Sequence, residues 1–471
     1  MANGQDLKIY LVNIKNPATK LSFPLGMAYI ARALEVAGMD FEVIDLLPVP
    51  PEERENVFLS RIRGVRNAVF GFGVIVGNRC LEINSHFAKL VRRHSPGSTV
   101  VFGGPLATAT PELLLKHGIC DHVVMGEGEE RFVTLLRSLT NGHADLDDSG
   151  IVSRSDAWSR DEEDTLDMDR AKRIAKIADI DRYAPPAYGR FDMDFYVGFY
   201  KAHGRCFEIN ASRGCRGNCA FCFKFVGRGF HARSAESLVA EIDAINCEHG
   251  FTGFLFREEN FLQNKALVRD FLSAVNGLGK DFSFRCISRL DDLDEETVRM
   301  IAGANFLSVG FGVESLNQKR LEQINKGTHV EDIEKTIDLL RRYGLDPRCS
   351  FILGFPDDTE EDFTAIYDFI RRNQVKGTVN LFTPLPRTRL FRDLKDDVMR
   401  AAEVDTVWDY VQLIDQASLF QDLVVNLTRY PDDVLMHYKK KCTDLAREPF
   451  NPVQGYECYV KPYDDKVITD A

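Results

Sequence analysis

The chain has 471 residues, about three times the length of a typical single domain, so we expect two or three domains that each bury a hydrophobic core. Hydrophobic residues make up 44% and charged residues 28%, a globular composition that excludes a disordered or fibrous chain. The formal net charge of −12 gives no electrostatic reason to bind nucleic acid. The sequence shows neither a signal region nor an apolar run long enough to span a membrane, so we expect a cytoplasmic protein.

The first 142 residues alternate short apolar runs with amphipathic segments. The pattern predicts strands near 9–13, 41–45, 68–73, 99–102 and 122–125, and helices near 25–38, 80–94 and 130–139. Strands that alternate with helices at this spacing predict an α/β fold, with a doubly wound, Rossmann-like parallel sheet covered on both faces. Ligands of such sheets bind at the carboxyl ends of the strands.

The period is lost over 143–200, where an acidic run at 161–164 and a Pro-Pro pair at 185–186 predict a linker. It returns over 201–395 as six strand-then-helix units. The expected strands lie near 206–211, 251–256, 282–287, 306–312, 348–353 and 377–382. Six such units predict a partial (β/α)6 barrel whose chemistry lies at the carboxyl ends of the strands. Residues 396–471 are expected to form a helical cap domain.

Three of the eleven cysteines, Cys215, Cys219 and Cys222, follow the first barrel strand in a C-x3-C-x2-C spacing. An odd number of cysteines without an export signal makes a disulfide framework improbable. A structural zinc site needs a fourth protein ligand, and a cluster that only transfers electrons normally takes four cysteines. Three thiolates therefore favour a [4Fe-4S] cluster with one open iron, and zinc completed by a distant Cys or His is the alternative.

The other eight cysteines are predicted to be buried and replaceable, with Cys206 and Cys286 the first to test because they lie on strands beside the cluster loop.

Further motifs follow the cysteines at the exits of later strands. They are Phe256-Arg257-Glu258-Glu259-Asn260, Cys286-Ile287-Ser288-Arg289, Ser308-Val309-Gly310-Phe311-Gly312-Val313-Glu314 and Ser350-Phe351-Ile352-Leu353-Gly354-Phe355-Pro356. With the cysteine spacing and the aromatic Phe221 before the last cysteine, their order over about 205–395 resembles the radical S-adenosylmethionine (SAM) superfamily.

The resemblance implies that the three cysteines are catalytic and hold the cluster while SAM chelates its open iron. It implies SAM contacts from Phe221, Glu258, Glu259, Ser288, Arg289, Glu314, Gly354 and Pro356. Glu258 is the preferred acceptor of the SAM ammonium group. One electron then cleaves SAM to a 5′-deoxyadenosyl radical. Arg387 departs from the pattern, because relatives tend to have glycine there, and indicates a sixth-strand exit shaped for a different, anionic substrate.

The amino-terminal domain resembles cobalamin-binding domains in the order of its loops. The resemblance implies cobalamin contacts from Phe23, Leu25, Gly26, Gly73, Val74, Asn78, Gly103, Gly104, Gly126 and Glu127. The signature D-x-H-x-x-G is not present, since Phe23 stands in place of the cobalt-ligating His and Leu21 in place of its Asp. Neither residue can ligate a metal, so we expect an unligated or water-ligated lower face covered by the apolar loop 74–78.

Together, the resemblances predict a methyltransferase-type (class B) cobalamin-dependent radical SAM enzyme. It would use the 5′-deoxyadenosyl radical and methylcobalamin to methylate an unactivated carbon of a peptide, a protein or a small metabolite, with flavodoxin or ferredoxin as electron donor. An oxidative cyclase or ring-rearranging enzyme with the same cofactors is one alternative. A corrinoid carrier or iron–sulfur electron-transfer protein is the other, and the carboxylate and arginine motifs argue against it.

Overall fold

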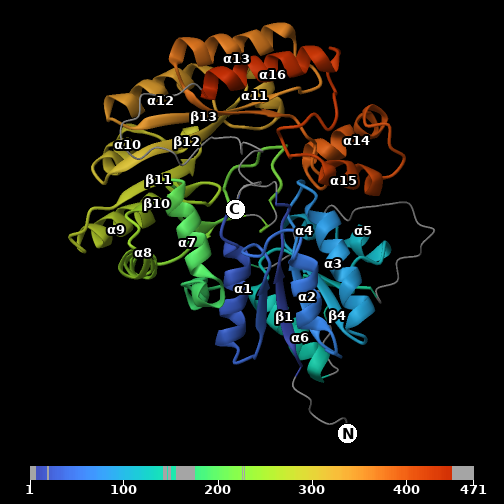
Figure 1. Ribbon diagram of the computed structural model, residues 1–471. Coiled ribbons are helices and arrows are strands. Elements are labelled where there is room, and N and C mark those ends of the chain that lie inside the picture. The colour runs from blue at the N-terminus through green and yellow to red at the C-terminus, as the bar shows by residue number, and fades with distance from the viewer. Residues whose placement is uncertain are drawn as a thin grey trace. The chain divides into compact units, whose positions relative to one another are not determined.

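The computed structural model describes residues 7–17, 21–141, 146, 150–154, 176–224, 226–227 and 229–447. The chain divides into two compact units (Figure 1). Unit 1 comprises residues 1–196, 224–227 and 404–419, and unit 2 comprises residues 197–223, 228–403 and 420–471. The expected cap at 396–471 is therefore divided between the two units, and its end, 448–471, lies outside the described residues.

Unit 1 contains a six-stranded sheet in the order β2-β1-β3-β4-β5-β6. Its strands are β1 (Ile9–Asn13), β2 (Glu42–Asp45), β3 (Val69–Gly73), β4 (Thr99–Gly103), β5 (His122–Val124) and β6 (Ile151–Ser153). The first five run parallel, and only β6 pairs antiparallel. The strand order reverses between β1 and β3, the place where ligands of doubly wound sheets bind.

Helices cover both faces of this sheet. They are α1 (Leu25–Val36), α2 (Arg54–Ile62), α3 (Cys80–His94), α4 (Pro105–Ala109), α5 (Pro111–Lys116), α6 (Glu129–Asn141), the 3-10 turns η2 (Asp181–Tyr183) and η3 (Tyr188–Arg190), and α15 (Val407–Gln416). The helix α7 (Met193–Ala202) begins in unit 1 and ends in unit 2.

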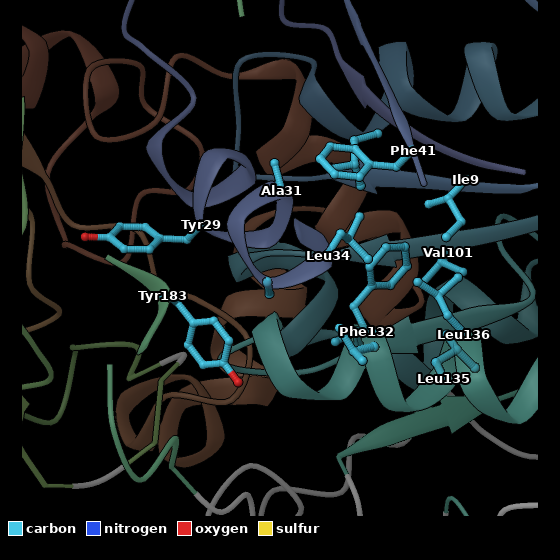
Figure 2. Close-up of a cluster of buried hydrophobic side chains, with 14 of the residues drawn as sticks. Ile9, Tyr29, Ala31, Leu34, Phe41, Val101, Phe132, Leu135, Leu136 and Tyr183 are labelled. Atoms are coloured by element: carbon cyan, nitrogen blue, oxygen red, sulfur yellow. The ribbon is translucent and has the colours of Figure 1, made fainter. Parts of the chain in front are cut away.

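The core of unit 1 explains why this sequence forms a sheet covered by helices. Every residue of β1 is buried, as expected for a parallel strand packed on both faces. Figure 2 shows Ile9 of β1 and Val101 of β4 near Leu34 of α1 and Phe132 of α6, all within one buried cluster. The helices therefore attach to the sheet through apolar side chains from both partners.

Unit 2 contains a six-stranded parallel sheet in the order β14-β13-β12-β11-β10-β7. Its strands are β7 (Phe207–Ile209), β10 (Gly253–Phe256), β11 (Ser283–Ser288), β12 (Phe306–Glu314), β13 (Asp346–Leu353) and β14 (Lys376–Leu381). Among the described strands, β7 and β14 form the two ends and do not pair with each other. The barrel is thus open, as the prediction of a partial barrel requires.

Helices and turns alternate with these strands. They are α8 (Ala235–His249), η4 (Phe261–Gln263), α9 (Lys265–Asn276), η5 (Leu290–Asp292), α10 (Glu295–Ala302), α11 (Gln318–Gln323), α12 (Val330–Arg342), α13 (Glu360–Asn373), α14 (Arg389–Ala401) and α16 (Asp432–Arg447). Several begin at a side chain that accepts a helix N–H, such as Ser234, Asp294 and Thr359. In Figure 1, α16 packs beside α13, and α16 also contacts β14.

The two faces of the unit 2 sheet differ in polarity. Along β13, Pro347, Cys349, Phe351 and Leu353 are buried, while the alternating residues are only partly buried. The period of two places every second side chain on the same face. One face of β13 is therefore fully buried, and its polar residues Asp346, Arg348 and Ser350 lie on the other face.

In the described part of the chain, no helix is long and apolar enough to cross a membrane.

Candidate functional site

The cysteine loop begins directly after the first strand of the unit 2 sheet. The short strands β8 (Ser212–Arg213) and β9 (His231–Ala232) pair antiparallel and join the two ends of the loop at its base. Cys215 and Cys219 are partly buried and Cys222 is exposed. The loop therefore lies at the carboxyl edge of a parallel sheet, where the active sites of such barrels are built.

The donor set of this loop fits an iron–sulfur cluster better than a single metal ion. Within the described ranges, no three His, Cys, Asp or Glu side chains converge closely enough to hold one ion. A structural zinc ion requires such convergence of four protein ligands. A cluster spreads its thiolate ligands over separate iron atoms, so three cysteines on one loop can hold it without meeting at a point.

Gln263, which follows the second strand in η4, anchors the start of the cysteine loop. Its Nε2 donates to the carbonyl oxygen of Gly214 at 2.8 Å, and its Oε1 accepts from the backbone N–H of Arg216 at 3.0 Å. The Gly214 N–H also donates to Glu259 Oε2 at 3.3 Å. Gln263 could not be predicted as a site residue, because its position five residues after Glu258 carries no recognisable pattern.

Glu258 is almost completely buried, with 1% of its surface exposed. Its Oε1 accepts from the Ala211 N–H at 3.3 Å and from the Ser212 hydroxyl at 3.4 Å. Its Oε2 is buried without a hydrogen-bond partner in the structure. Burial raises the pKa of Glu258 to about 8, although backbone N–H groups, including that of Ala211, lower it. A buried unpartnered carboxylate oxygen is costly, so it fits the predicted role of accepting a ligand ammonium group.

The residue beside it, Glu259, is exposed.

Asn260, which follows β10, holds the carboxyl end of β11 through hydrogen bonds. Asn260 Oδ1 accepts from the Ser288 hydroxyl at 2.8 Å and from the Arg289 N–H at 3.2 Å. Its Nδ2 donates to Asp292 Oδ2 at 2.7 Å. The side chain of Arg289 reaches the cysteine loop, where its Nη1 donates to Cys219 Sγ at 3.3 Å. The structure thus brings the Arg289 side chain to the cysteine loop, while the Ser288 hydroxyl bonds Asn260 at the neighbouring strand exit.

Glu314 ends the fourth strand with a left-handed backbone (φ 65°), at a shift in the register between β12 and β13. Its Oε1 accepts from Lys326 Nζ at 2.7 Å, and both side chains are buried. Burial lowers the pKa of Lys326, but Glu314 and then Cys219 raise it by more, so the net shift is upward. Lys326 was missed by the sequence analysis, since a lysine in a turn after a short helix gives no signal of its own.

The fifth strand exits at Gly354, whose φ of 96° favours glycine. Asp358 Oδ2 accepts from the N–H groups of Gly354 and Phe355 at 3.0 and 2.9 Å. Burial raises the pKa of Asp358 to about 6, while Arg320 lowers it. Pro356 is partly exposed, and Phe221 packs against the buried cluster that contains Phe355.

Arg387 lies in the turn between β14 and α14 and has a φ of 65°. This conformation suits the glycine expected at the position, so the Arg side chain here comes with backbone strain.

In unit 1, the predicted glycines lie along the carboxyl edge of the sheet. Gly73 and Gly103 end the neighbouring strands β3 and β4 and are register partners. Gly104 has a φ of 92°, and a Cβ there would lie 2.8 Å from the Val74 carbonyl oxygen, so contact with the chain itself requires this glycine. Gly26, the second residue of α1, faces open space.

Two of the predicted cobalamin residues also have clear structural tasks. Phe23 is buried, with its ring centroid 5.1–5.2 Å from those of Tyr188, Phe191 and Tyr196. Glu127 is buried, and its Oε2 accepts from the Ile177 N–H at 3.0 Å. Their contacts to cobalamin stay predictions.

The remaining predicted cobalamin residues lie in loops and turns of unit 1. Leu25 is partly buried at the start of α1, and the Gly126 N–H donates to Thr108 Oγ1 at 2.9 Å. In the loop 74–78, Val74 is buried, Asn78 has a φ of 59°, and Ile75 is 40% exposed.

Of the other eight cysteines, six are buried and Cys247 is exposed, while Cys458 lies outside the described residues. Cys206 and Cys286 are among the buried ones, and burial raises the pKa of the Cys286 thiol well above its usual range. That they can be replaced stays a prediction.

Comparison with known protein families agrees with this division into two units. Residues 209–370 match the Radical SAM superfamily, and residues 14–136 match the B12 binding domain. The bacteriochlorophyllide d C-12(1)-methyltransferase of Chlorobaculum tepidum is 30% identical over 340 residues, which cover 70% of this chain and 67% of that protein. The chain belongs to the cobalamin-dependent radical SAM enzyme family. The two domains imply a [4Fe-4S] cluster, SAM and cobalamin as the cofactors of this radical SAM enzyme.

Other relatives of this cobalamin-dependent radical SAM enzyme differ in their reactions. An uncharacterized methyltransferase of Pyrococcus horikoshii is 28% identical over 375 residues, covering 78% of this chain and 77% of that protein. An anaerobic magnesium-protoporphyrin IX monomethyl ester cyclase of Cereibacter sphaeroides is 25% identical over 457 residues, covering 90% and 69%.

Among solved structures, the radical SAM methyltransferase TsrM of Kitasatospora setae, with cobalamin and a [4Fe-4S] cluster bound, has the same fold. Its TM-score is 0.69 at 17% identity, over 84% of this chain and 76% of that one.

Proposed function

We propose that this enzyme is a radical SAM C-methyltransferase that methylates an unactivated carbon of a peptide, a protein or a small metabolite. The observation that carries the proposal is the cysteine loop at the carboxyl edge of the unit 2 sheet, which lies beside the buried, unpartnered Oε2 of Glu258. When bound, the cluster and SAM supply a radical that abstracts hydrogen, and cobalamin supplies the methyl group. The methyltransferase relatives support this choice of reaction.

In this proposal the residues of unit 2 hold and orient SAM. Glu258 accepts the ammonium group of SAM with its Oε2, and Ser288 and Glu314 contribute polar contacts near the cysteine loop. Gly354 and Pro356 border the adenine, because the turn that Asp358 stabilises lets the backbone come close to a planar ring. Held this way, the reacting groups are positioned before the chemistry begins.

The residues of unit 1 would hold cobalamin at the carboxyl edge of their sheet. Gly73 and Gly103 leave this edge without side chains, so that the nucleotide tail can lie against the strands. No histidine occurs in the loop 74–78, and the exposed Ile75 would cover the lower face of the corrin ring with an apolar surface.

A cyclase reaction is the second candidate, favoured by the similarity to the magnesium-protoporphyrin IX monomethyl ester cyclase. Both candidates use the same cofactors and would produce 5′-deoxyadenosine. They differ because methyl transfer also converts a second SAM to S-adenosylhomocysteine and adds one methylene to the mass of the product.

The test is product analysis with the anaerobically reconstituted full chain, SAM, a ferredoxin or flavodoxin reductant, and extracts of the source cells. We expect about four iron atoms per chain, bound corrinoid, and 5′-deoxyadenosine together with S-adenosylhomocysteine. Mass spectrometry of the extract, including its peptides, then identifies the product that gains one methylene. A protein that binds no corrinoid, or that makes 5′-deoxyadenosine without S-adenosylhomocysteine, would contradict the methyltransferase assignment.

Cysteine variants give this test a matched pair. Cys222→Ala removes one predicted cluster ligand, so we expect loss of the cluster and of 5′-deoxyadenosine formation. Cys247→Ala removes a cysteine that is also exposed but lies on α8, away from the loop, so it should keep both. If Cys222→Ala still formed 5′-deoxyadenosine, the loop would not be the cluster site.

A further inference from the structure

We propose that Arg289 is a positioning residue for the cluster ligand Cys219, and that it raises the reduction potential of the bound cluster. This inference rests on the proposed function only through the assignment of the cluster to the cysteine loop. It differs from the expected role of Arg289 as a contact to SAM.

Most N–H donors of the Arg289 guanidinium form hydrogen bonds within the chain. Its Nε and Nη2 donate to the two carboxylate oxygens of Asp291 at 2.8 and 2.9 Å. Its Nη2 also donates to the carbonyl oxygen of Lys326, and its Nη1 donates to Cys219 Sγ at 3.3 Å. Since a guanidinium has five N–H donors and these contacts use four of them, one donor on Nη1 is left. Arg289 therefore cannot hold a SAM carboxylate with two parallel hydrogen bonds.

A glycine of the cysteine loop makes room for this side chain. A Cβ on Gly217, between Cys215 and Cys219, would lie 2.6 Å from Nη1 and 3.2 Å from Cζ of Arg289. A side chain at position 217 would therefore displace the guanidinium from its place over the cysteine loop, which gives the glycine of the C-x3-C segment a packing reason.

The turn that receives Nη2 also holds the loop on both sides of Cys219. The Ala220 N–H donates to the Ile324 carbonyl oxygen at 2.8 Å, and Asn325 Nδ2 donates to the Asn218 carbonyl oxygen at 2.8 Å. Arg289 reaches Cys219 from the exit of β11, while the turn 324–327 follows α11. Cys219 is therefore positioned by two segments that lie far from it in the sequence.

A hydrogen bond from a cation to a cluster thiolate has an electrochemical consequence. Reduction adds a negative charge to the cluster, and hydrogen bonds to its sulfurs are among the features that set its potential. The Nη1–H of Arg289 would stabilise the more negative, reduced state, so its loss should make the cluster harder to reduce. Asp291 opposes part of this effect because its carboxylate is paired with the same guanidinium.

The experiment is an EPR-monitored redox titration of the full chain with a reconstituted cluster, without SAM or substrate. In Arg289→Gln we expect the ratio of reduced to oxidised cluster at a fixed potential to fall about tenfold, which is about 59 mV for a one-electron couple. Arg289→Lys keeps the positive charge but loses the planar guanidinium, so its cluster potential should lie between those of wild type and Arg289→Gln.

Arg216→Gln is the matched control. Arg216 is an exposed cation of the same loop, and its guanidinium lies 5.7 Å from the centre of the Phe230 ring. This variant changes the net charge by the same amount, yet its shift should be clearly smaller. An equal shift in Arg289→Gln and Arg216→Gln would overturn the proposal, because it would show that only the net charge matters.

Gly217→Ala supplies an independent test, since its Cβ should displace the guanidinium while Arg289 is still present. It should reproduce the shift of Arg289→Gln, and the double variant should show no further shift. Additive shifts would overturn the proposal. If Gly217→Ala forms no cluster, Arg289→Lys and Arg289→Gln decide the question.

Two further results are informative. An unchanged cluster potential in Arg289→Gln would overturn the proposal. This holds even if the variant forms less cluster, which would indicate a structural role, or binds SAM more than tenfold more weakly, which would indicate a SAM contact. If the wild-type chain itself gave no [4Fe-4S] signal, the cluster assignment behind the proposed function would fail, and this outcome is distinct from the first.

Discussion

The buried carboxylate of Glu258 combines a structural contact with a proposed ligand-binding role. Its two oxygens have different environments, since one accepts hydrogen bonds from the chain and the other has no partner in the structure. The first contact ties the second strand to the segment before the cysteine loop. The second oxygen offers a ligand an acceptor in a buried place, where a charged interaction is strong.

The pKa of Glu258 predicts a pH dependence of stability. Burial raises it in the folded chain from 4.5 to about 8. Between these values the folded chain keeps a proton that the unfolded chain releases, so this residue lowers the free energy of unfolding as pH rises toward 8. The Gln side chain of Glu258→Gln cannot ionise. We therefore expect the melting temperature of this variant minus that of wild type, both measured without ligands, to be larger at pH 8.5 than at pH 6.

Thermal unfolding at the two pH values measures this difference. Glu259→Gln removes the neighbouring exposed carboxylate. Its melting temperature should differ from that of wild type by the same amount at both pH values. If Glu258→Gln behaved in the same way as Glu259→Gln, Glu258 would not be protonated in the folded chain.

At the scale of secondary-structure elements, helix α3 shows how a distant segment can complete a helix. Its N-cap residue Arg79 has a left-handed backbone (φ 55°) and provides no side-chain cap. The carboxylate of Asp415, in α15, accepts instead from the N–H groups of Leu81 and Glu82, each at 2.9 Å. A negative charge at a helix N-terminus also interacts favourably with the helix dipole. This contact helps to explain why residues 404–419 group with unit 1.

We therefore expect Asp415→Asn to lower the free energy of unfolding of unit 1 by about 1–2 kcal/mol, the usual cost of losing a charged cap. Urea unfolding measures the change. Asp405→Asn removes the same charge from an exposed position just before α15 and should change stability little. An equal loss in both variants would mean that the cap contact contributes nothing specific.

The regular elements that the sequence predicts best are those with a clear period. The strands β1 and β12 and the helices α3 and α6 occur close to where their apolar patterns place them. The helices α2, α4, α5 and α11 were not predicted. The strand β6 lies inside the segment that we expected to be a linker, and α7 begins in it. Short helices offer too few turns for a period to show, and their formation depends on tertiary packing.

At the scale of the whole molecule, each unit buries its own core, and this predicts independent unfolding. Leu34 in unit 1 and Leu340 in unit 2 are both completely buried in helices. We expect two transitions in calorimetry. Each Leu→Ala variant should destabilise a different one by about 2–5 kcal/mol. One shared transition that moves in both variants would show that the units unfold together.

The sequence by itself determined the fold class and the two-part organisation, and it singled out the three cysteines that we propose as cluster ligands. These features depend on local period and on the order of motifs along the chain, which the amino acids display directly. Parallel strands bring consecutive exits to one edge, so the motif order already indicates that the exit with Arg289 lies on the same edge as the cysteine loop.

Only the tertiary structure decided which side chains meet. Arg289 on Cys219, Lys326 on Glu314, Gln263 on the start of the loop and Asp415 on α3 each join segments that are separated in the sequence. Their partners are chosen by distance and direction in the folded chain, and a polar residue in a turn shows neither in the sequence. The close approach of Gly104 to the Val74 carbonyl oxygen is likewise visible only in the folded chain, and its contact to cobalamin stays a prediction.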